Sequence, residues 1–291
     1  MNPMKNKPKN CLLIRLMIAI ILCTVFVFCK LGFTVQSAQI GSSILQQVDA
    51  GSIIFMTVPL YQHEDSYKLL LVNEEYPNLL DEGAKKIVSA GGRVPLSTAG
   101  IQLEEETLLQ AEKMFSAARD AGITNLVVTS GYRSRQEQEE LYREAKNKKY
   151  VARPGTSEHE LGLALDIQVL RSITGIKSKR WLEQHAHKYG FIIRYPKEKT
   201  ALTGKPYEPW HYRYVGYPHA AVIYESDFCL EEYIAALQPG KYYQVTAAGK
   251  KYFLYRVKPQ GNHLLVPRGR DYWFSSDGTG HYIVTAEIGV E

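Results

Sequence analysis

The spacing of apolar and polar residues predicts a central region in which helices and strands alternate irregularly. Residues 104–121 carry apolar side chains at helical spacing, and Gly122 follows as a stop signal. Ser134 begins a second helix, which runs to about Lys148, and Glu137 completes a capping box with it. Strands are predicted at 67–73, 123–129, 163–169, 191–195 and 212–215, and further helices at 177–189, 218–225 and 230–238.

The pattern changes at Pro239-Gly240, where helical spacing gives way to short alternating runs. Strands with hairpin turns are predicted at 242–246, 252–257, 272–274 and 281–286. Residues 36–65 show no clear period. We therefore expect a spacer at 36–65, a compact domain at 66–238 and a small all-β appendage at 239–291.

The N-terminus is typical of a membrane-targeting segment. An apolar run from Cys11 to Phe28 is interrupted only by Arg15 and is preceded by three lysines. Its length and flanking charge predict a single-pass anchor at 1–35, with the rest of the chain on the extracellular side of the cell membrane. The alternative is a signal peptide cleaved before Ala38, which would make the protein secreted.

Charge and cysteine content narrow the possible partners and the possible kinds of site. The net charge of +5 comes from five basic residues in the first 48 positions, and the rest of the chain balances 30 basic against 30 acidic residues. Without a basic excess there, we expect no nucleic-acid partner. Cys229 is the only cysteine beyond the N-terminal segment, which excludes a disulfide framework or a cysteine zinc site in the exported part.

Two short segments carry the candidate chemistry, at 157–166 (SEHELGLALD) and 208–211 (EPWH). His159, His211 and Asp166 offer two imidazoles and a carboxylate, which can hold a zinc ion and leave a position open, as in catalytic zinc sites. Glu208 is a spare carboxylate of the kind that a hydrolytic zinc enzyme needs as a general base. Arg133, between a predicted strand and a helix, could bind a carboxylate or a developing oxyanion.

The sequence argues against two other sites, a second histidine metal site and a serine nucleophile. His185 and His187 lie on a predicted helix, where residues two apart point about 200° away from each other and cannot share an ion. A penicillin-type serine peptidase would need Ser-x-x-Lys, and no serine in the chain has lysine three residues later.

At these residues the chain resembles the VanY-type zinc D-Ala-D-Ala carboxypeptidases, which are related to VanX dipeptidases and to hedgehog-like proteins. The resemblance rests on Ser-x-His-x-x-Gly-x-Ala-x-Asp at 157–166, Glu-x-Trp-His at 208–211 and Ser-Gly-Tyr-Arg at 130–133, and covers about 68–238. It implies an α+β fold with a small, mainly antiparallel sheet flanked by helices. The implied site residues are His159, Asp166 and His211 as ligands of one zinc ion, Glu208 as base, Arg133 at the carbonyl, and Ser157, Gln138 and Tyr195 at the substrate.

The resemblance further implies a peptidoglycan precursor ending in D-Ala-D-Ala as substrate, and a contribution to vancomycin resistance and cell-wall remodelling. Three alternatives stay open. The same metal site would serve an L,D-carboxypeptidase or a D,D-dipeptidase. A non-catalytic zinc module that binds the cell wall is an alternative of another class. Residues 240–291 could also act as a structural β-adaptor.

Overall fold

The computed structural model describes residues 44–51, 53–60, 67–80, 82–170 and 175–290, which all fall within one compact unit, Ser42–Glu291. The predicted anchor at 1–35 lies outside these residues. In the part of the chain that is described, no helix has both the length and the apolar character needed to cross a membrane.

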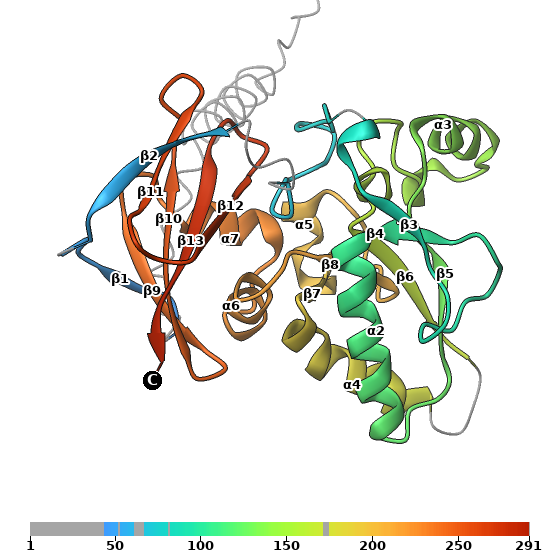
Figure 1. The fold of residues 1–291 in the computed structure, drawn as a ribbon. Coiled ribbons are helices and arrows are strands. Elements are labelled where there is room, and N and C mark those ends of the chain that lie inside the picture. Colours follow the sequence, from blue (N-terminus) through green and yellow to red (C-terminus); the bar gives the residue numbers. More distant parts are fainter. Residues whose placement is uncertain (1–43, 52, 61–66, 81, 171–174, 291) are drawn as a thin grey trace, which may run out of the picture. The chain divides into compact units, whose positions relative to one another are not determined.

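A four-stranded antiparallel sheet, called the central sheet below, shares the main hydrophobic core with the long helix α2 (Glu105–Asp120) (Figure 1). The strand order is β5 (Leu126–Ser130), β6 (Ala164–Val169), β8 (His211–Tyr214) and β7 (Phe191–Ile193). Alternate residues of the strands point to opposite faces. One face joins α2 in the main core, which includes Met114, Phe115, Leu163, Leu165, Ile167, Tyr212 and Tyr214. The other face carries the polar residues considered below.

The predicted helices form with small shifts at their ends. Helix α2 begins at a Glu104 cap, and α3 (Arg135–Glu144) has the expected capping box between Ser134 and Glu137 but ends earlier than predicted. Within the described residues, the other α-helices are α4 (Gly175–His185), α5 (Thr200–Thr203), α6 (His219–Glu225) and α7 (Leu230–Ala236). The same residues form the 3-10 helices η2 (Glu82–Ala84), η3 (Lys148–Tyr150), η4 (Glu158–Leu161), η5 (Ala186–Tyr189) and η6 (Lys197–Lys199). Strand β3 (Ile87–Ser89) pairs with β4 (Gln102–Glu104).

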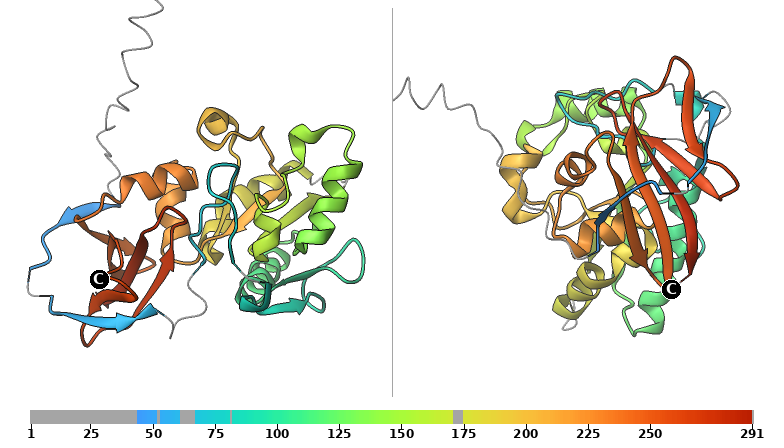
Figure 2. Two further views of the ribbon diagram at one scale, coloured as in Figure 1. Left: turned by 90° about the horizontal axis from the view of Figure 1, so that it is seen from above. Right: turned by 90° about the vertical axis from the view of Figure 1, so that its left-hand side faces the viewer.

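The C-terminal segment is all-β, as predicted, but it does not form its sheets alone. Strands β1 (Gln46–Val48) and β2 (Phe55–Pro59), in the region expected to be a spacer, pair with β9 (Tyr242–Ala247) and β11 (His263–Pro267). Figures 1 and 2 show the two blue strands among the orange and red ones. The five-stranded sheet has the order β1-β9-β10-β13-β12, with β9 (Tyr242–Ala247), β10 (Lys250–Val257), β13 (Tyr282–Val290) and β12 (Tyr272–Ser276), and β11 (His263–Pro267) pairs with β2.

One expected strand is absent: residues 67–73 form no ladder. Their apolar side chains are buried, but their backbone groups bind elsewhere. The Leu69 N–H donates to Ser275 Oγ at 2.8 Å and the Leu71 N–H to the Asp277 carbonyl at 3.1 Å. The Lys68 and Leu70 carbonyls both accept from the Arg213 side chain at 3.0 Å. The segment thus joins the C-terminal β region to the central sheet.

Candidate metal centre and active site

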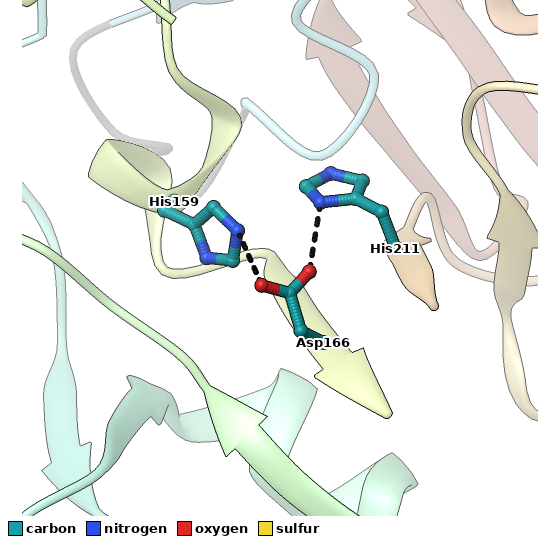
Figure 3. A group of neighbouring side chains, drawn as sticks. All are labelled: His159, Asp166 and His211. Carbon is teal, nitrogen blue, oxygen red and sulfur yellow. Dashed lines mark hydrogen bonds and ion pairs between the residues drawn. The ribbon is translucent and has the colours of Figure 1, made fainter. Parts of the chain in front are cut away.

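Two of the predicted metal ligands face each other across the central sheet. Asp166 of β6 is the direct register partner of His211 of β8. Side chains at directly opposed positions of antiparallel strands lie on the same face and within contact. His211 Nδ1 lies 3.1 Å from Asp166 Oδ1 (Figure 3). Because the neighbouring pair, Leu165 and Tyr212, faces the core, this register turns Asp166 and His211 to the opposite face.

His159 reaches the same place from the short helix η4, which ends at Gly162 in the left-handed conformation with φ 73°. The backbone carbonyl of Gly131 lies 2.7 Å from His159 Nδ1 and accepts its proton. That hydrogen bond leaves Nε2 free as a ligand atom, 3.5 Å from Asp166 Oδ2. Figure 3 shows both imidazoles turned toward the single carboxylate between them.

The three side chains fit a metal ion. One nitrogen from each histidine and one oxygen of Asp166 all lie within 4.8 Å of one another. Two imidazole nitrogens and a carboxylate form a donor set that suits zinc, and three protein ligands would leave such an ion able to take water or substrate as a further ligand. The hydrogen bond from His159 to a carbonyl is the kind of support that metal-binding histidines have. In the part of the chain that the structure describes, no other group of three such residues has this spacing.

The electrostatics of the site favour the deprotonated, metal-binding forms of Asp166 and His159. Burial opposes ionisation of Asp166, but the two adjacent imidazoles outweigh it and hold the Asp166 pKa well below its usual range. Burial, aided by the nearby Arg133 charge, lowers the pKa of His159 to about 4. Burial alone would lower the pKa of His211 too, but hydrogen bonds to Asp166 and Glu158 raise it to about 9. Hence a cation bound here displaces a proton from His211.

Glu208 is delivered to the same pocket by a tight turn. The His211 N–H donates to the Glu208 carbonyl at 3.1 Å, with Pro209 at the second turn position, which fits its fixed φ. The side chain is 7% exposed. Burial raises the Glu208 pKa, while His211 and Lys205 pull it down and Asp166 raises it further. A glutamate with a raised pKa is suited to accept a proton near neutral pH.

The pocket has a volume of about 290 Å³ and contains seven of the eight predicted site residues: Arg133, Ser157, His159, Asp166, Tyr195, Glu208 and His211. This volume is at the low end for small-molecule sites, so it suits the end of a peptide rather than a long stem. Arg133 is half-buried, its Nε atom is buried without a hydrogen-bond partner, and burial lowers its pKa against the pull of Asp166 and other carboxylates. Tyr195 lies beside the metal ligands, with its ring 5.0 Å from that of His211.

Gln138, the eighth predicted residue, is placed behind the pocket wall and is not among the lining residues. Its side chain is fully buried and donates from Nε2 to the Ala152 carbonyl at 2.7 Å, while Oε1 has no partner. Ala152 itself lines the pocket. In this geometry Gln138 supports the wall, and its contact with substrate remains a prediction.

Sequence reasoning missed several residues of this site. Tyr150 and Trp210 line the pocket and are 51% and 41% exposed, and Lys205 adds a cation. An aromatic next to a predicted ligand was the available signal for Trp210. Sequence reasoning also gave no role to Glu158, which separates the candidate substrate contact Ser157 from the ligand His159.

The histidine pair that the sequence analysis set aside lies outside the pocket. His185 stacks on Trp181, whereas His187 stacks on Tyr224.

Comparison with known proteins agrees with this geometry. The family model described as VanY, D-alanyl-D-alanine carboxypeptidase, matches residues 100–217. A D-alanyl-D-alanine carboxypeptidase from Enterococcus faecium is 36% identical over 225 residues, covering 75% of this chain and 74% of that protein. The solved vancomycin resistance D,D-dipeptidase VanXYg, in complex with a D-Ala-D-Ala phosphinate analog, matches with a TM-score of 0.69 and 29% identity, covering 81% of this chain and 100% of its own. A solved variant of the vancomycin resistance D,D-pentapeptidase VanY, in complex with Zn(II), matches with a TM-score of 0.50 and 36% identity. The match covers 57% of this chain and 98% of that chain.

Proposed function

Because this chain belongs to the VanY family of D-alanyl-D-alanine carboxypeptidases, we propose that it removes the C-terminal D-alanine from peptidoglycan precursors with one zinc ion held by His159, Asp166 and His211. The chain is a hydrolase of the carboxypeptidase class, and its α+β fold matches that of solved VanX- and VanY-type enzymes. Bound between these ligands, zinc would act as a Lewis acid and make a water molecule more acidic near neutral pH.

The residues of the pocket divide the remaining work. Glu208 accepts the proton of the water that attacks the carbonyl of the penultimate residue, and then passes it to the nitrogen of the leaving D-alanine. The half-buried Arg133 guanidinium stabilises the negative charge that develops on the carbonyl oxygen. Ser157 and Tyr195 are placed to contact the peptide end, because both line the pocket beside the ligands.

One observation carries this proposal above a non-catalytic zinc module. Glu208 lies in the same pocket as the three ligands, is 7% exposed and has a raised pKa. A module that only binds the cell wall has no use for a buried carboxylate that is not a ligand. An enzyme needs such a group to move protons at the reacting carbonyl.

The test is release of D-alanine from three substrates: a pentapeptide precursor ending in D-Ala-D-Ala, the matching tetrapeptide, and free D-Ala-D-Ala. We expect release from the pentapeptide that a chelator abolishes and zinc restores. Preference for the tetrapeptide would indicate an L,D-carboxypeptidase, and preference for the dipeptide a D,D-dipeptidase. No release from any of them by zinc-loaded protein would contradict the enzymatic proposal and favour the binding module.

The biological setting follows from the substrate. Trimming the D-Ala-D-Ala end removes the dipeptide that vancomycin binds, so we propose a contribution to vancomycin resistance. We also propose that residues 1–35 anchor the chain to the membrane with residues 66–238 outside as the catalytic domain, where it would meet precursors after their export. Protease treatment of intact cells tests this topology: digestion of the catalytic region without lysis is expected, and full protection would contradict it.

A further inference from the structure

A buried cluster of charged side chains lies directly behind the metal site. Glu158, Arg194 and Arg213 are 1%, 0% and 0% exposed. Glu158 Oε1 accepts from Arg194 Nε and from Arg213 Nη1, both at 2.7 Å. The two guanidiniums outweigh the effect of burial and hold the Glu158 pKa well below its usual range. Glu158 is therefore a carboxylate with one oxygen shared between two arginines.

Both arginines are themselves held in place. Arg194 donates to the two oxygens of Glu231 in α7, at 2.9 and 2.6 Å. Arg213 donates from Nε to the Tyr214 carbonyl at 3.0 Å, and from Nη2 to two carbonyls of the 67–73 segment. Two guanidiniums and two carboxylates balance in charge, as buried ion networks require. Glu158 is thus fixed from three separate parts of the chain.

The second oxygen of Glu158 faces the metal site. Oε2 lies 3.4 Å from Nε2 of His211, on the side of the imidazole opposite Asp166. We propose that Glu158 is a positioning residue for His211: it accepts the Nε2 proton and thereby keeps Nδ1 turned toward Asp166 and the ion. This inference rests on the proposed metal set of His159, Asp166 and His211. It supplies His211 with the kind of partner that the Gly131 carbonyl supplies to His159.

The division of the two oxygens distinguishes this role from simple neutralisation of the arginines. Both arginine contacts fall on Oε1, which leaves Oε2 to the histidine. In Glu158→Gln, one of these two positions becomes an amide NH₂. The amide then presents a donor either to His211 Nε2–H or to the guanidiniums, and neither group can accept a hydrogen bond.

The experiment compares Glu158→Gln with Glu231→Gln in the full chain. Both variants remove one carboxylate from the same arginine network, but Glu231 does not contact His211. Zinc affinity is measured by competition with a chelating dye, and the ligand geometry by the visible absorption of the cobalt-substituted protein. We expect about 10- to 100-fold weaker zinc binding and a changed cobalt spectrum for Glu158→Gln. For Glu231→Gln we expect affinity within about twofold of the parent and an unchanged spectrum, even if its Tm falls.

A second variant covers the case in which Glu158→Gln does not fold. Glu158→Asp keeps the negative charge for the arginines but is one methylene too short to hold both them and His211. It is expected to fold and to show the same loss of zinc affinity. The inference is overturned if a folded Glu158 variant binds zinc like the parent, or if Glu231→Gln loses affinity equally. Failure of the parent protein to bind zinc would instead contradict the proposed metal site.

Discussion

Replacing Gly131 with alanine tests how closely the backbone must approach for the metal site to form. The residue has an ordinary φ, so its need for glycine is one of space. A Cβ at this position would lie 2.3 Å from the Gln102 carbonyl oxygen and 2.9 Å from Ile101 Cγ2. The Gly131 carbonyl, in turn, accepts the hydrogen bond that orients His159.

The size of the effect follows from these distances. Real Cβ contacts are essentially never below 3.0 Å, so the backbone at 131 and the Gln102 carbonyl must separate by at least about 0.7 Å. Taken up along the 2.7 Å bond to His159 Nδ1, such a shift lengthens it to about 3.4 Å, a distance that weakens a hydrogen bond to a neutral carbonyl more than one to a charged carboxylate. We expect about 10- to 100-fold weaker zinc binding from the loss of this support. Overpacking should also cost about 1–3 kcal/mol of stability, or roughly 2–12 °C in Tm.

Zinc competition titration and thermal unfolding of the metal-free protein measure the two effects separately. Gly91→Ala is the matched control, because a Cβ there meets nothing within 4 Å and the backbone has no positive φ. If Gly131→Ala and Gly91→Ala both match the parent protein in zinc affinity and Tm, the close backbone approach at Gly131 does not support the metal site.

Three further predictions address charge, metal and pH. Arg133→Met should lower kcat by about 10²- to 10³-fold, with a smaller change in KM, while the exposed Arg143→Met should leave both unchanged; equal kinetics for the two variants would contradict the oxyanion role. Removing zinc with a chelator should abolish D-alanine release, and zinc at 100 times its Kd should add about 2.7 kcal/mol of stability; metal-independent release would contradict the site. Burial lowers the pKa of His219 from 6.5 to about 3, so its contribution to stability is complete above pH 6.5 and is lost as the pH falls toward 3. In urea unfolding between pH 7.5 and 5, the parent protein should therefore lose about 2 kcal/mol more stability than His219→Gln does; equal pH dependence of the two proteins would contradict this role of His219.

Local patterns predicted most of the central elements. Helix α2 carries a clear apolar stripe, and the capping box at Ser134 is local chemistry, so both were found where predicted. Strand β6 was recognised by its alternation, which also puts Asp166 on the face away from the core. His159, Asp166 and His211 could be grouped because a metal site needs all three donors together.

The errors have a common physical origin in contacts between residues far apart in the chain. The run at 67–73 is as apolar as a strand, but the Arg213 side chain takes two of its carbonyls. Strands β1 and β2 are short, and their pairing partners lie about 200 residues later, so no local pattern reveals them. The role of Glu158 was equally hidden, although an arginine inside each of two apolar strand segments signals a buried carboxylate partner.

Substitution of Glu208 distinguishes an enzyme from a zinc-binding module, because only the enzyme needs this glutamate to accept a proton. In Glu208→Gln the charge is lost but the shape is kept, and none of the three ligands changes. The measurement is D-alanine release from the pentapeptide precursor by protein whose zinc content is determined in the same sample, with the exposed Glu198→Gln as control. We expect one zinc ion per chain in both variants. D-alanine release should fall about 10²- to 10⁴-fold in Glu208→Gln and stay unchanged in Glu198→Gln. Full activity of a zinc-loaded Glu208→Gln protein would contradict the proposed role of Glu208.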